Sequence, residues 1–557
     1  NTTFIMGMPQ PGRIGFLSQS GGVCGGIIDY IIGKRIGFSR FVSLGNEADV
    51  TETDMIDYLG QDPHTGVIAA YVEAITDGCR FMEVSRRVTR CKPIVLLKAG
   101  RTAAGGRAVS SHTGAMAGSN DAYEAAFKQC GIIQAASIPD LFDISLALAN
   151  QPLPAGRRVF VLSNSGGPAA LAADNLATQG LALPELEPAA KACLQERLEP
   201  AIQLTNPIDM LGGAGPDEYE FALPVILADP NVEAVLVIVV PHLLLDPTEA
   251  AHKICRAAND AAKPVLTCFL GDHSVNEARQ ILHQHCLPMY PFPETASRAL
   301  SAMVHYAHWR NHNHIEPPPE IERNSQAAAL ALANANSSGA LGEAAARPIL
   351  TAYGIPIIPG QLARSPQAAV EIANELGYPV ALKIVSPDIV HKSEAGGIKL
   401  GLGDPPAVAA AYRHLQQATG LAGSEDRLEG VLVEAMAPPG NEVIVGMRRD
   451  PQFGPLIMFG LGGIYVELFA DVSFRVAPFN RPEALALIHE TRAGRLLAGW
   501  RGRDRSDIDA VADCILRLSQ LALDFPQIKE VEINPLLVLA EGEGVMALDG
   551  RILLSAH

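Results

Sequence analysis

A pattern of a short apolar run followed by two glycines occurs twice in this chain. The run RIGFLS begins at Arg13 and leads into QSGG, and the run RVFVLS begins at Arg158 and leads into NSGG. In both places an apolar stretch of small residues follows the glycines. This order predicts a strand, a tight turn and a helix. Two copies in equivalent surroundings indicate an internal repeat at the scale of a domain.

Each copy continues with strand-like runs that are separated by helical segments. The further predicted strands are Phe41 to Leu44, Gly66 to Val72 and Pro93 to Lys98 in the first copy, and Val235 to Val240 and Pro264 to Phe269 in the second. Regular alternation of strands and helices predicts an α/β fold whose parallel sheets carry helices on both faces. With 557 residues the chain is also too long for one hydrophobic core, so three or four domains are expected.

The pattern changes after the second copy. Residues 311–336 are rich in polar residues, proline and alanine, which predicts a linker. From Leu341 onward two helices precede several strand-like runs, among them PVALKIVS, GVLVEAM, EVIVGMRR and a closing pair near the end. This order predicts a mostly antiparallel α+β module. The predicted division is residues 1–11, 12–152, 153–312, 313–340 and 341–557.

The overall composition excludes several classes of partner. A formal net charge of -17 disfavours nucleic acid and anionic membranes, because both repel an acidic protein. The nine cysteines form no CxxC pair, and the most apolar run is shorter than the ~20 residues that span a bilayer. No secretory leader precedes the first strand, so we expect a cytoplasmic protein. The first residue is Asn1, and we expect the natural start to lie upstream.

The two glycine turns are candidates for an anion site. Exposed backbone N–H groups at a helix start attract a negative charge, and the helix dipole adds to this attraction. A single turn of this kind is more often an ordinary helix cap. Two equivalent copies favour phosphate binding by both. The predicted phosphate-binding residues are Ser20, Gly21, Gly22, Ser165, Gly166 and Gly167.

A histidine lies between the two turns in the segment AVSSHTGAMAGS. This residue, His112, is flanked by small residues that allow a ligand to approach closely. A lone histidine is more often structural, and the chain has 15 of them. Glu73 ends the run GVIAAYVE, at the sheet edge where open α/β folds bind ligands. Its carboxylate could hold one ring nitrogen of a histidine and leave the other free to attack phosphorus, or it could be a helix-start acid.

The last module contains oxygen ligands and a lysine that suit a nucleotide site. Lys383 lies in PVALKI, and His391 lies in the following glycine-containing loop. Asn534 in VEINPL and Asp549 in ALDG are expected on adjacent strands, where hard oxygen ligands suit Mg²⁺. Each residue alone could equally be a surface or turn residue. The chain has no GxxxxGK[ST] motif, so the nucleotide site is not a P-loop.

Taken together these segments resemble a known family. The segments that carry the resemblance are RIGFLSQSGG, FVSLGNEADV, YVEAI, SSHTGAMAGS, VLSNSGG, LTNPIDM, PVALKIVSPDIVHKSEAGG, DPQFGPLIMFGLGG and VEINPLLV. They are similar to the fused ADP-forming acetyl-CoA synthetases, which are relatives of succinyl-CoA synthetase. The resemblance covers nearly the whole chain. It implies two flavodoxin-like domains followed by an ATP-grasp domain.

The resemblance also implies a reaction and a set of site residues. An acyl-CoA, phosphate and ADP give the free acid, CoA and ATP, and the phosphoryl group passes through a histidine. The cofactors implied are ATP or ADP and Mg²⁺, with a CoA thioester as substrate and, by analogy, a homodimer. The matching residues are His112 as the phosphorylated histidine, Glu73 as the acid that holds it, His391 as a second relay, Lys383 and Glu434 at the nucleotide, and Asn534 and Asp549 as metal ligands.

Two features qualify the resemblance. Family members begin with a CoA-binding domain, whereas only NTTFIMGMPQPG precedes the first predicted strand. The alternative reading is the acyl-CoA-sensing, synthetase-like part of a bacterial protein lysine acetyltransferase. Such sensors commonly lack the loop histidine, whereas His112, Glu73 and VEINPL are all present here. We therefore expect a working acid-thiol ligase.

Overall fold

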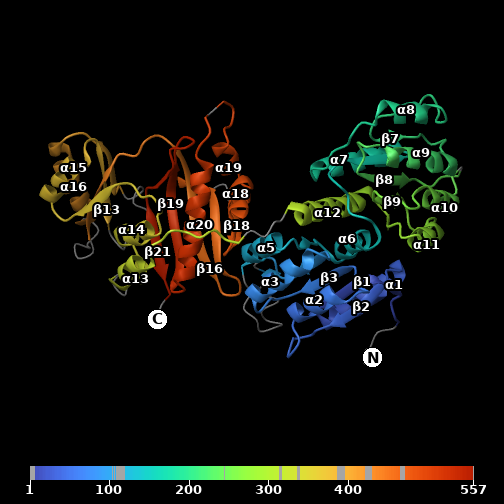
Figure 1. Cartoon of the computed structure of the whole chain (residues 1–557), viewed down its shortest axis with the longest axis horizontal. Coiled ribbons are helices and arrows are strands. Elements are labelled where there is room, and N and C mark those ends of the chain that lie inside the picture. The colour runs from blue at the N-terminus through green and yellow to red at the C-terminus, as the bar shows by residue number, and fades with distance from the viewer. Residues whose placement is uncertain are drawn as a thin grey trace. The chain divides into compact units, whose positions relative to one another are not determined.

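The computed structural model shows two compact units, which we describe separately (Figure 1). The first comprises residues 1–120 and 127–314, and the second comprises residues 121–126 and 315–557. The structure describes residues 7–102, 104–105, 107, 119–243, 245–312, 317–334, 339–385, 396–420, 429–463, 471–502 and 504–555.

The first unit begins with a five-stranded parallel sheet in the order β2-β1-β3-β4-β5. Its strands are β1 Pro11–Ser18, β2 Phe38–Ser43, β3 Val67–Val72, β4 Ile94–Lys98 and β5 Ile133–Gln134. The helices of this part of the chain are α1 Gly21–Lys34, α2 Glu52–Gln61, α3 Gly78–Thr89, α5 Asn120–Gln129 and α6 Ile138–Asn150. Strand β2 is added on one side of β1, and β3 to β5 are added on the other side. The topological switch point therefore lies between β1 and β3, and ligands of doubly wound sheets bind beside such a point.

A second five-stranded parallel sheet repeats this topology in the order β7-β6-β8-β9-β10. Its strands are β6 Val159–Ser163, β7 Ile208–Asp209, β8 Ala234–Val239, β9 Val265–Phe269 and β10 Met289–Tyr290. Its helices are α7 Gly166–Thr178, α8 Pro188–Gln195, α9 Pro216–Ala228, α10 Pro247–Ala257, α11 Asn276–Gln284 and α12 Pro293–His312. The predicted pair of parallel-sheet α/β domains is confirmed.

The apolar runs that predicted the central strands are buried on both faces. Every residue of β6, β8 and β9 is buried, as expected for parallel strands with helices on either side. Helix α12 packs against both α6 and α7 and so belongs to the cores of both sheets. Among the described residues no helix has the length and apolar character needed to cross a bilayer.

The second unit contains two antiparallel sheets. The larger one has the order β11-β21-β19-β16-β17-β18, with β20 paired to β19, and the smaller one has the order β12-β15-β13-β14. The strands are β11 Ala340–Leu341, β12 Gly360–Ala363, β13 Val380–Val385, β14 Ile398–Leu402, β15 Gly430–Ala435, β16 Asn441–Asp450, β17 Gly454–Leu461, β18 Val472–Val476, β19 Ile528–Val538, β20 Val545–Ala547 and β21 Gly550–Leu554. The predicted antiparallel α+β module is confirmed.

Helices cover these sheets and build two cores, a small one with the smaller sheet and a large one with the larger sheet. They are α13 Ser325–Asn334, α14 Glu343–Ala352, α15 Pro366–Leu376, α16 Pro405–Gly420, α18 Arg481–His489, α19 Arg492–Leu497 and α20 Ile508–Asp524. Helix α20 places most of its apolar face in the large core, and helix α14 contributes Ile349 and Leu350 to the same core. The helix predicted to begin at Leu341 is preceded by the short strand β11, and α14 itself begins at Glu343.

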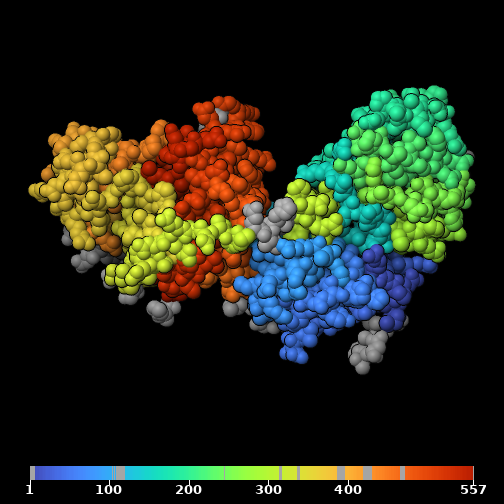
Figure 2. All heavy atoms as spheres, viewed as in Figure 1, coloured from blue at the N-terminus to red at the C-terminus, as the bar shows by residue number. Residues whose placement is uncertain are grey.

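Residues 313–340, predicted as a linker, contain a helix that packs into the second unit. Helix α13 lies inside this range, and its residues Ala328 and Leu332 are buried in the core of the second unit. The alanine-rich sequence that suggested a linker also has high helix propensity, and packing against α14 supplies the missing stabilisation. Figure 2 shows this yellow-green segment lying on the red, C-terminal part of the chain.

Candidate active site

The first glycine turn joins β1 to α1 at the point where the sheet order changes direction. Ser20 caps α1, and its Oγ accepts a hydrogen bond of 3.4 Å from the backbone N–H of Val23. The backbone N–H of Ser20 donates to Oγ of Ser18 at 3.1 Å, which fixes the turn. Gly22 is exposed, and a Cβ atom at this position would meet nothing within 4 Å. The start of α1 is therefore open to a ligand.

The second glycine turn has nearly the same internal geometry. The backbone N–H of Ser165 donates to Oγ of Ser163 at 3.1 Å, as Ser20 does to Ser18. One difference is that no side chain caps α7. A Cβ atom on Gly166 would lie 2.8 Å from Oδ2 of Asp209, so a carboxylate already lies beside this helix start. The sequence did not single out Asp209, although it lies in the quoted segment LTNPIDM.

Glu73 follows β3 and is only 9% exposed. Its backbone N–H donates to Oε1 of Gln19 at 2.5 Å, and that of Ala74 donates to the same oxygen at 3.0 Å. Lys98 at the end of β4 donates to the carbonyl of Glu73 at 2.8 Å, and burial lowers the pKa of Lys98 to about 8. Residues at the ends of the two neighbouring strands, β1 and β4, therefore hold the backbone of Glu73. His112 lies outside the described residues.

Two further acids near Gln19 were not predicted as site residues. Oε1 of Glu47 accepts a hydrogen bond of 2.9 Å from the backbone N–H of Glu52, and Gln19 donates to Glu52 at 3.4 Å. Burial and the neighbouring Glu52 raise the pKa of Glu47 to about 8. Burial also raises the pKa of Glu52. The only signal in the sequence is the run of acids in GNEADVTETD, which is equally typical of a surface loop.

Lys383 and Glu434 of the predicted nucleotide site are brought together on the smaller antiparallel sheet. Lys383 on β13 lies 2.7 Å from Oε2 of Glu434 on β15, and its Nζ donates to the carbonyl of Leu548 at 2.5 Å. Glu434 is almost fully buried, and this burial raises its pKa to about 7. Glu343 and Arg347 on α14 complete the cluster and were not predicted. Their spacing of four residues was the available signal, because it places both on one helix face.

Asn534 and Asp549 lie close together in the larger sheet, where β19 changes its pairing partner from β21 to β20. The backbone N–H of Asn534 donates to the carbonyl of Asp549 at 3.3 Å, and its side-chain oxygen accepts from the N–H of Gly463 at 3.0 Å. Asp549 was expected on a strand, but it lies in the short connection between β20 and β21. This connection also includes Leu548, which binds Lys383, so the predicted phosphate-binding and metal-binding residues are neighbours.

The donor set fits a hard cation only in part. An amide oxygen and a carboxylate are ligands that Mg²⁺ accepts, and Mg²⁺ usually takes few protein ligands together with substrate phosphates. Within the described ranges no group of three or more His, Cys, Asp or Glu is arranged to hold a metal ion. A cation at Asn534 and Asp549 would therefore depend on phosphate oxygens and water for the rest of its shell. His391 lies outside the described residues.

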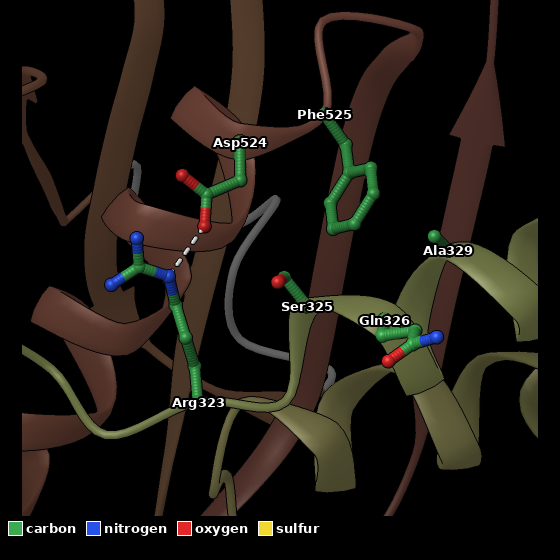
Figure 3. A pocket seen from close by; sticks show the side chains of 6 residues that line it. All are labelled: Arg323, Ser325, Gln326, Ala329, Asp524 and Phe525. Atoms are coloured by element: carbon green, nitrogen blue, oxygen red, sulfur yellow. Dashed lines mark ion pairs between the residues drawn. The ribbon is translucent and has the colours of Figure 1, made fainter.

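A surface pocket of the second unit lies apart from these residues. Its volume is about 460 Å³, and its lining comes from Arg323 before α13, from the first turns of α13 and from the end of α20 (Figure 3). Arg323 and Asp524 form an ion pair of 2.7 Å across its wall. None of the predicted site residues lines this pocket. We therefore do not assign the nucleotide to it.

Comparison with known proteins identifies the family. Three family models match: a succinyl-CoA ligase like flavodoxin domain at residues 11–148, a ligase-CoA domain at 159–315 and an ATP-grasp domain at 332–554. The acetate–CoA ligase [ADP-forming] I of Archaeoglobus fulgidus is 40% identical over 555 residues, which cover 100% of this chain and 79% of that protein. The chain belongs to this family of ADP-forming acetate–CoA ligases. The predicted family and its fold are thus confirmed.

Relatives within the ADP-forming ligases differ in the acid that they are named for. The 4-hydroxybutyrate–CoA ligase [ADP-forming] of Nitrosopumilus maritimus is 35% identical, over 99% of this chain and 79% of its own length. A solved structure of the dinucleotide forming acetyl-coenzyme A synthetase 1 of Ca. Korarchaeum cryptofilum, in complex with phosphate and ADP, is 38% identical. It aligns with a TM-score of 0.54 over 56% of this chain and 68% of that one.

Proposed function

We propose that this chain catalyses the reversible reaction of an acyl-CoA, phosphate and ADP to the free acid, CoA and ATP. Family membership supports this proposal, and so does the arrangement of the predicted nucleotide-site residues in the second unit. The single observation that carries it is the position of Lys383, which lies between buried Glu434 and the connection that holds Asp549. The acetyltransferase-sensor alternative has no support in the comparisons.

The phosphoryl group is carried by His112. Phosphate oxygen attacks the thioester carbonyl and releases CoA, which leaves an acyl phosphate. A ring nitrogen of His112 then attacks phosphorus, the P–O bond to the acyl group breaks, and the free carboxylate leaves. The backbone N–H groups at the starts of α1 and α7, with Ser20 and Ser165, stabilise the negative charge during both transfers. Glu73 holds the imidazole ring so that one nitrogen faces phosphorus.

A second transfer delivers the phosphoryl group to ADP. A ring nitrogen of His391 attacks phosphorus and the P–N bond to His112 breaks; oxygen of the β-phosphate of ADP then attacks, and the P–N bond to His391 breaks to give ATP. Lys383 binds the phosphates, and Glu434 on β15 is assigned to the adenine side. When bound, Mg²⁺ neutralises phosphate charge. Asn534 and Asp549 would hold it.

The proposal also assigns partners and domains. Residues 12–152 and 153–312 supply the phosphate cradle, and residues 341–557 supply the nucleotide site. The small ligands are a nucleotide, phosphate, a carboxylic acid and its CoA thioester. We further propose a cytoplasmic protein that forms a homodimer.

Synthesis of ATP from acetyl phosphate tests this function without a need for CoA. The purified chain is mixed with acetyl phosphate, ADP and Mg²⁺, and ATP is measured by luminescence. We expect ATP from the wild-type chain and none above background from His112→Ala. Absence of ATP from a wild-type chain that binds ADP would overturn the proposed function. The rate of ATP formation from a panel of other acyl phosphates then shows which acids the chain prefers.

A further inference from the structure

Four charged side chains form one buried cluster at the nucleotide end of the second unit. Glu343 and Arg347 come from α14, Lys383 from β13 and Glu434 from β15. Arg347 pairs with Glu434 and lies 3.8 Å from Glu343, while Lys383 lies 2.7 Å from Glu434 and 3.6 Å from Glu343. The two acids are nearly inaccessible, at 4% and 1% exposure. Two positive charges therefore balance two negative charges away from water.

The pairing of Lys383 conflicts with its proposed task. To bind a nucleotide phosphate, the ammonium group of Lys383 must give up at least part of its interaction with Glu434. A buried carboxylate that loses its counter-charge is strongly destabilised, so Glu434 would resist this movement. Glu434 could respond by taking up a proton, because burial already raises its pKa to about 7.

Arg347 offers another way to stabilise Glu434. It contacts Oε1 of Glu434, whereas Lys383 contacts Oε2, so both cations bind the same carboxylate at once. Arg347 also donates to the carbonyl of Ile358 at 2.8 Å, which anchors its guanidinium. A guanidinium remains charged at every relevant pH, so it keeps Glu434 ionised when Lys383 leaves.

We propose that Arg347 is a positioning residue of the nucleotide site, which holds the charge of Glu434 while Lys383 turns from Glu434 to the nucleotide phosphate. This inference rests on the proposed function, because it takes Lys383 as the phosphate-binding lysine. Among the residues that the structure describes, the charged groups that face Glu434 are Glu343 and Arg347 from α14 and Lys383 from β13. The neighbouring strand β12 contributes only Gly360 at this point.

The inference predicts a proton-linked binding defect. In Arg347→Gln, Lys383 can leave Glu434 only if the carboxylate is protonated, so nucleotide binding becomes coupled to proton uptake. We expect the Kd for a non-hydrolysable ATP analogue with Mg²⁺ to rise about tenfold or more at pH 8.5, and the defect to shrink toward pH 6. Arg347→Lys should retain affinity within about threefold, because it keeps the positive charge.

The double variant Arg347→Gln/Glu434→Gln separates this role from a structural one. Without the carboxylate, Lys383 is no longer held by Glu434, so binding at pH 8.5 should recover relative to Arg347→Gln and lose its added pH dependence. Arg517→Gln is the matched control, since Arg517 also pairs with an acid one helical turn away, Asp513, and with a carbonyl, that of Tyr353. It should show no pH-dependent binding defect.

Calorimetric titrations at pH 6 and 8.5 measure the Kd of each variant for the analogue, and thermal unfolding shows whether each variant is folded. A pH-dependent defect in Arg347→Gln that the second substitution relieves supports the inference. Equal affinity in Arg347→Gln and wild type, or a double variant that binds no better than the single one at pH 8.5, overturns it. A wild-type chain that does not bind the analogue would instead overturn the proposed function.

Discussion

Gln19 binds the backbone of Glu73, with Oε1 accepting the Glu73 N–H at 2.5 Å and Nε2 donating to the next carbonyl at 2.7 Å. Asn164 makes the equivalent pair of bonds in the second domain, accepting from the N–H of Val240 at 2.8 Å and donating to its carbonyl at 3.0 Å. The repeat therefore extends to a side chain that joins the ends of two adjacent strands at each topological switch point.

The first prediction concerns the stability that these two amides provide. Gln19→Ala and Asn164→Ala each leave buried backbone groups without their side-chain partner, which costs about 1–3 kcal/mol. We expect both variants to lower the free energy of unfolding by similar amounts, measured by urea denaturation. Loss of less than about 0.5 kcal/mol in either variant would show that water replaces the amide there.

The second prediction concerns the carboxylate of Glu73. Glu73→Gln keeps the size of the side chain but removes the charge that orients a histidine ring, and such partners are typically worth about 10–100-fold. We expect the rate of His112 phosphorylation by ATP to fall by that factor, with unfolding unchanged within about 1 kcal/mol. The control is Glu83→Gln, an exposed acid of α3 in the same domain, which should phosphorylate at the wild-type rate.

The third prediction concerns the pH dependence of stability at Glu47. The pKa of Glu47 is about 8 in the folded chain, above its ordinary value of 4.5, because burial and Glu52 favour the protonated form. The folded state therefore holds a proton that the unfolded state has released, so stability falls as pH rises from about 4.5 to about 8. Glu47→Gln mimics the protonated form and should lose less stability over this range.

Urea denaturation at pH 5 and pH 8.5 checks the Glu47 prediction. The variant should gain stability relative to wild type at pH 8.5 and show a smaller difference at pH 5. Parallel curves for the two proteins at both pH values would show that Glu47 does not carry this dependence.

The fourth prediction concerns the candidate cation ligands. Asn534→Ala and Asp549→Ala each remove an oxygen ligand, so Mg²⁺-dependent binding of a non-hydrolysable ATP analogue should weaken at least about tenfold. Binding measured with excess EDTA should differ little between these variants and wild type. Glu543→Ala, an exposed acid of the turn between β19 and β20, is the control and should bind normally. Equal Mg²⁺ dependence in all four proteins would remove the ligand assignment.

Much of the fold could be predicted because its signals are local. The repeated strand and glycine turn predicted two similar parallel sheets, and the two helices expected after Leu341 are present as α14 and α15. The polar and proline-rich stretch concealed α13, because the burial of Ala328 depends on a core formed elsewhere in the chain. Local sequence signals thus predict helices and strands well, but they do not predict elements whose stability depends on tertiary packing.

The candidate site could be predicted only where residues occur in a recognisable motif. Lys383 and Glu434 are predicted in this way and lie together in the structure, whereas Arg347 is not predicted, because its contact with Glu434 joins positions 87 residues apart. Gln19 was missed for a similar reason, since its partners on the next strand are 54 and 55 residues away. Asp549 was placed on a strand because the turn between β20 and β21 has no proline and is only two residues long.

The central claim is that His112 carries the phosphoryl group. The most direct test incubates the purified chain with Mg²⁺ and γ-labelled ATP and measures protein-bound label that is acid-labile and alkali-stable, in wild type, His112→Ala and His391→Ala. The account predicts label on the wild-type chain, no more than the share held by the additional carrier His391 on His112→Ala, and slower labelling of His391→Ala. A wild-type chain that binds ATP but takes up no label, or a His112→Ala variant labelled as fully as wild type, would contradict it.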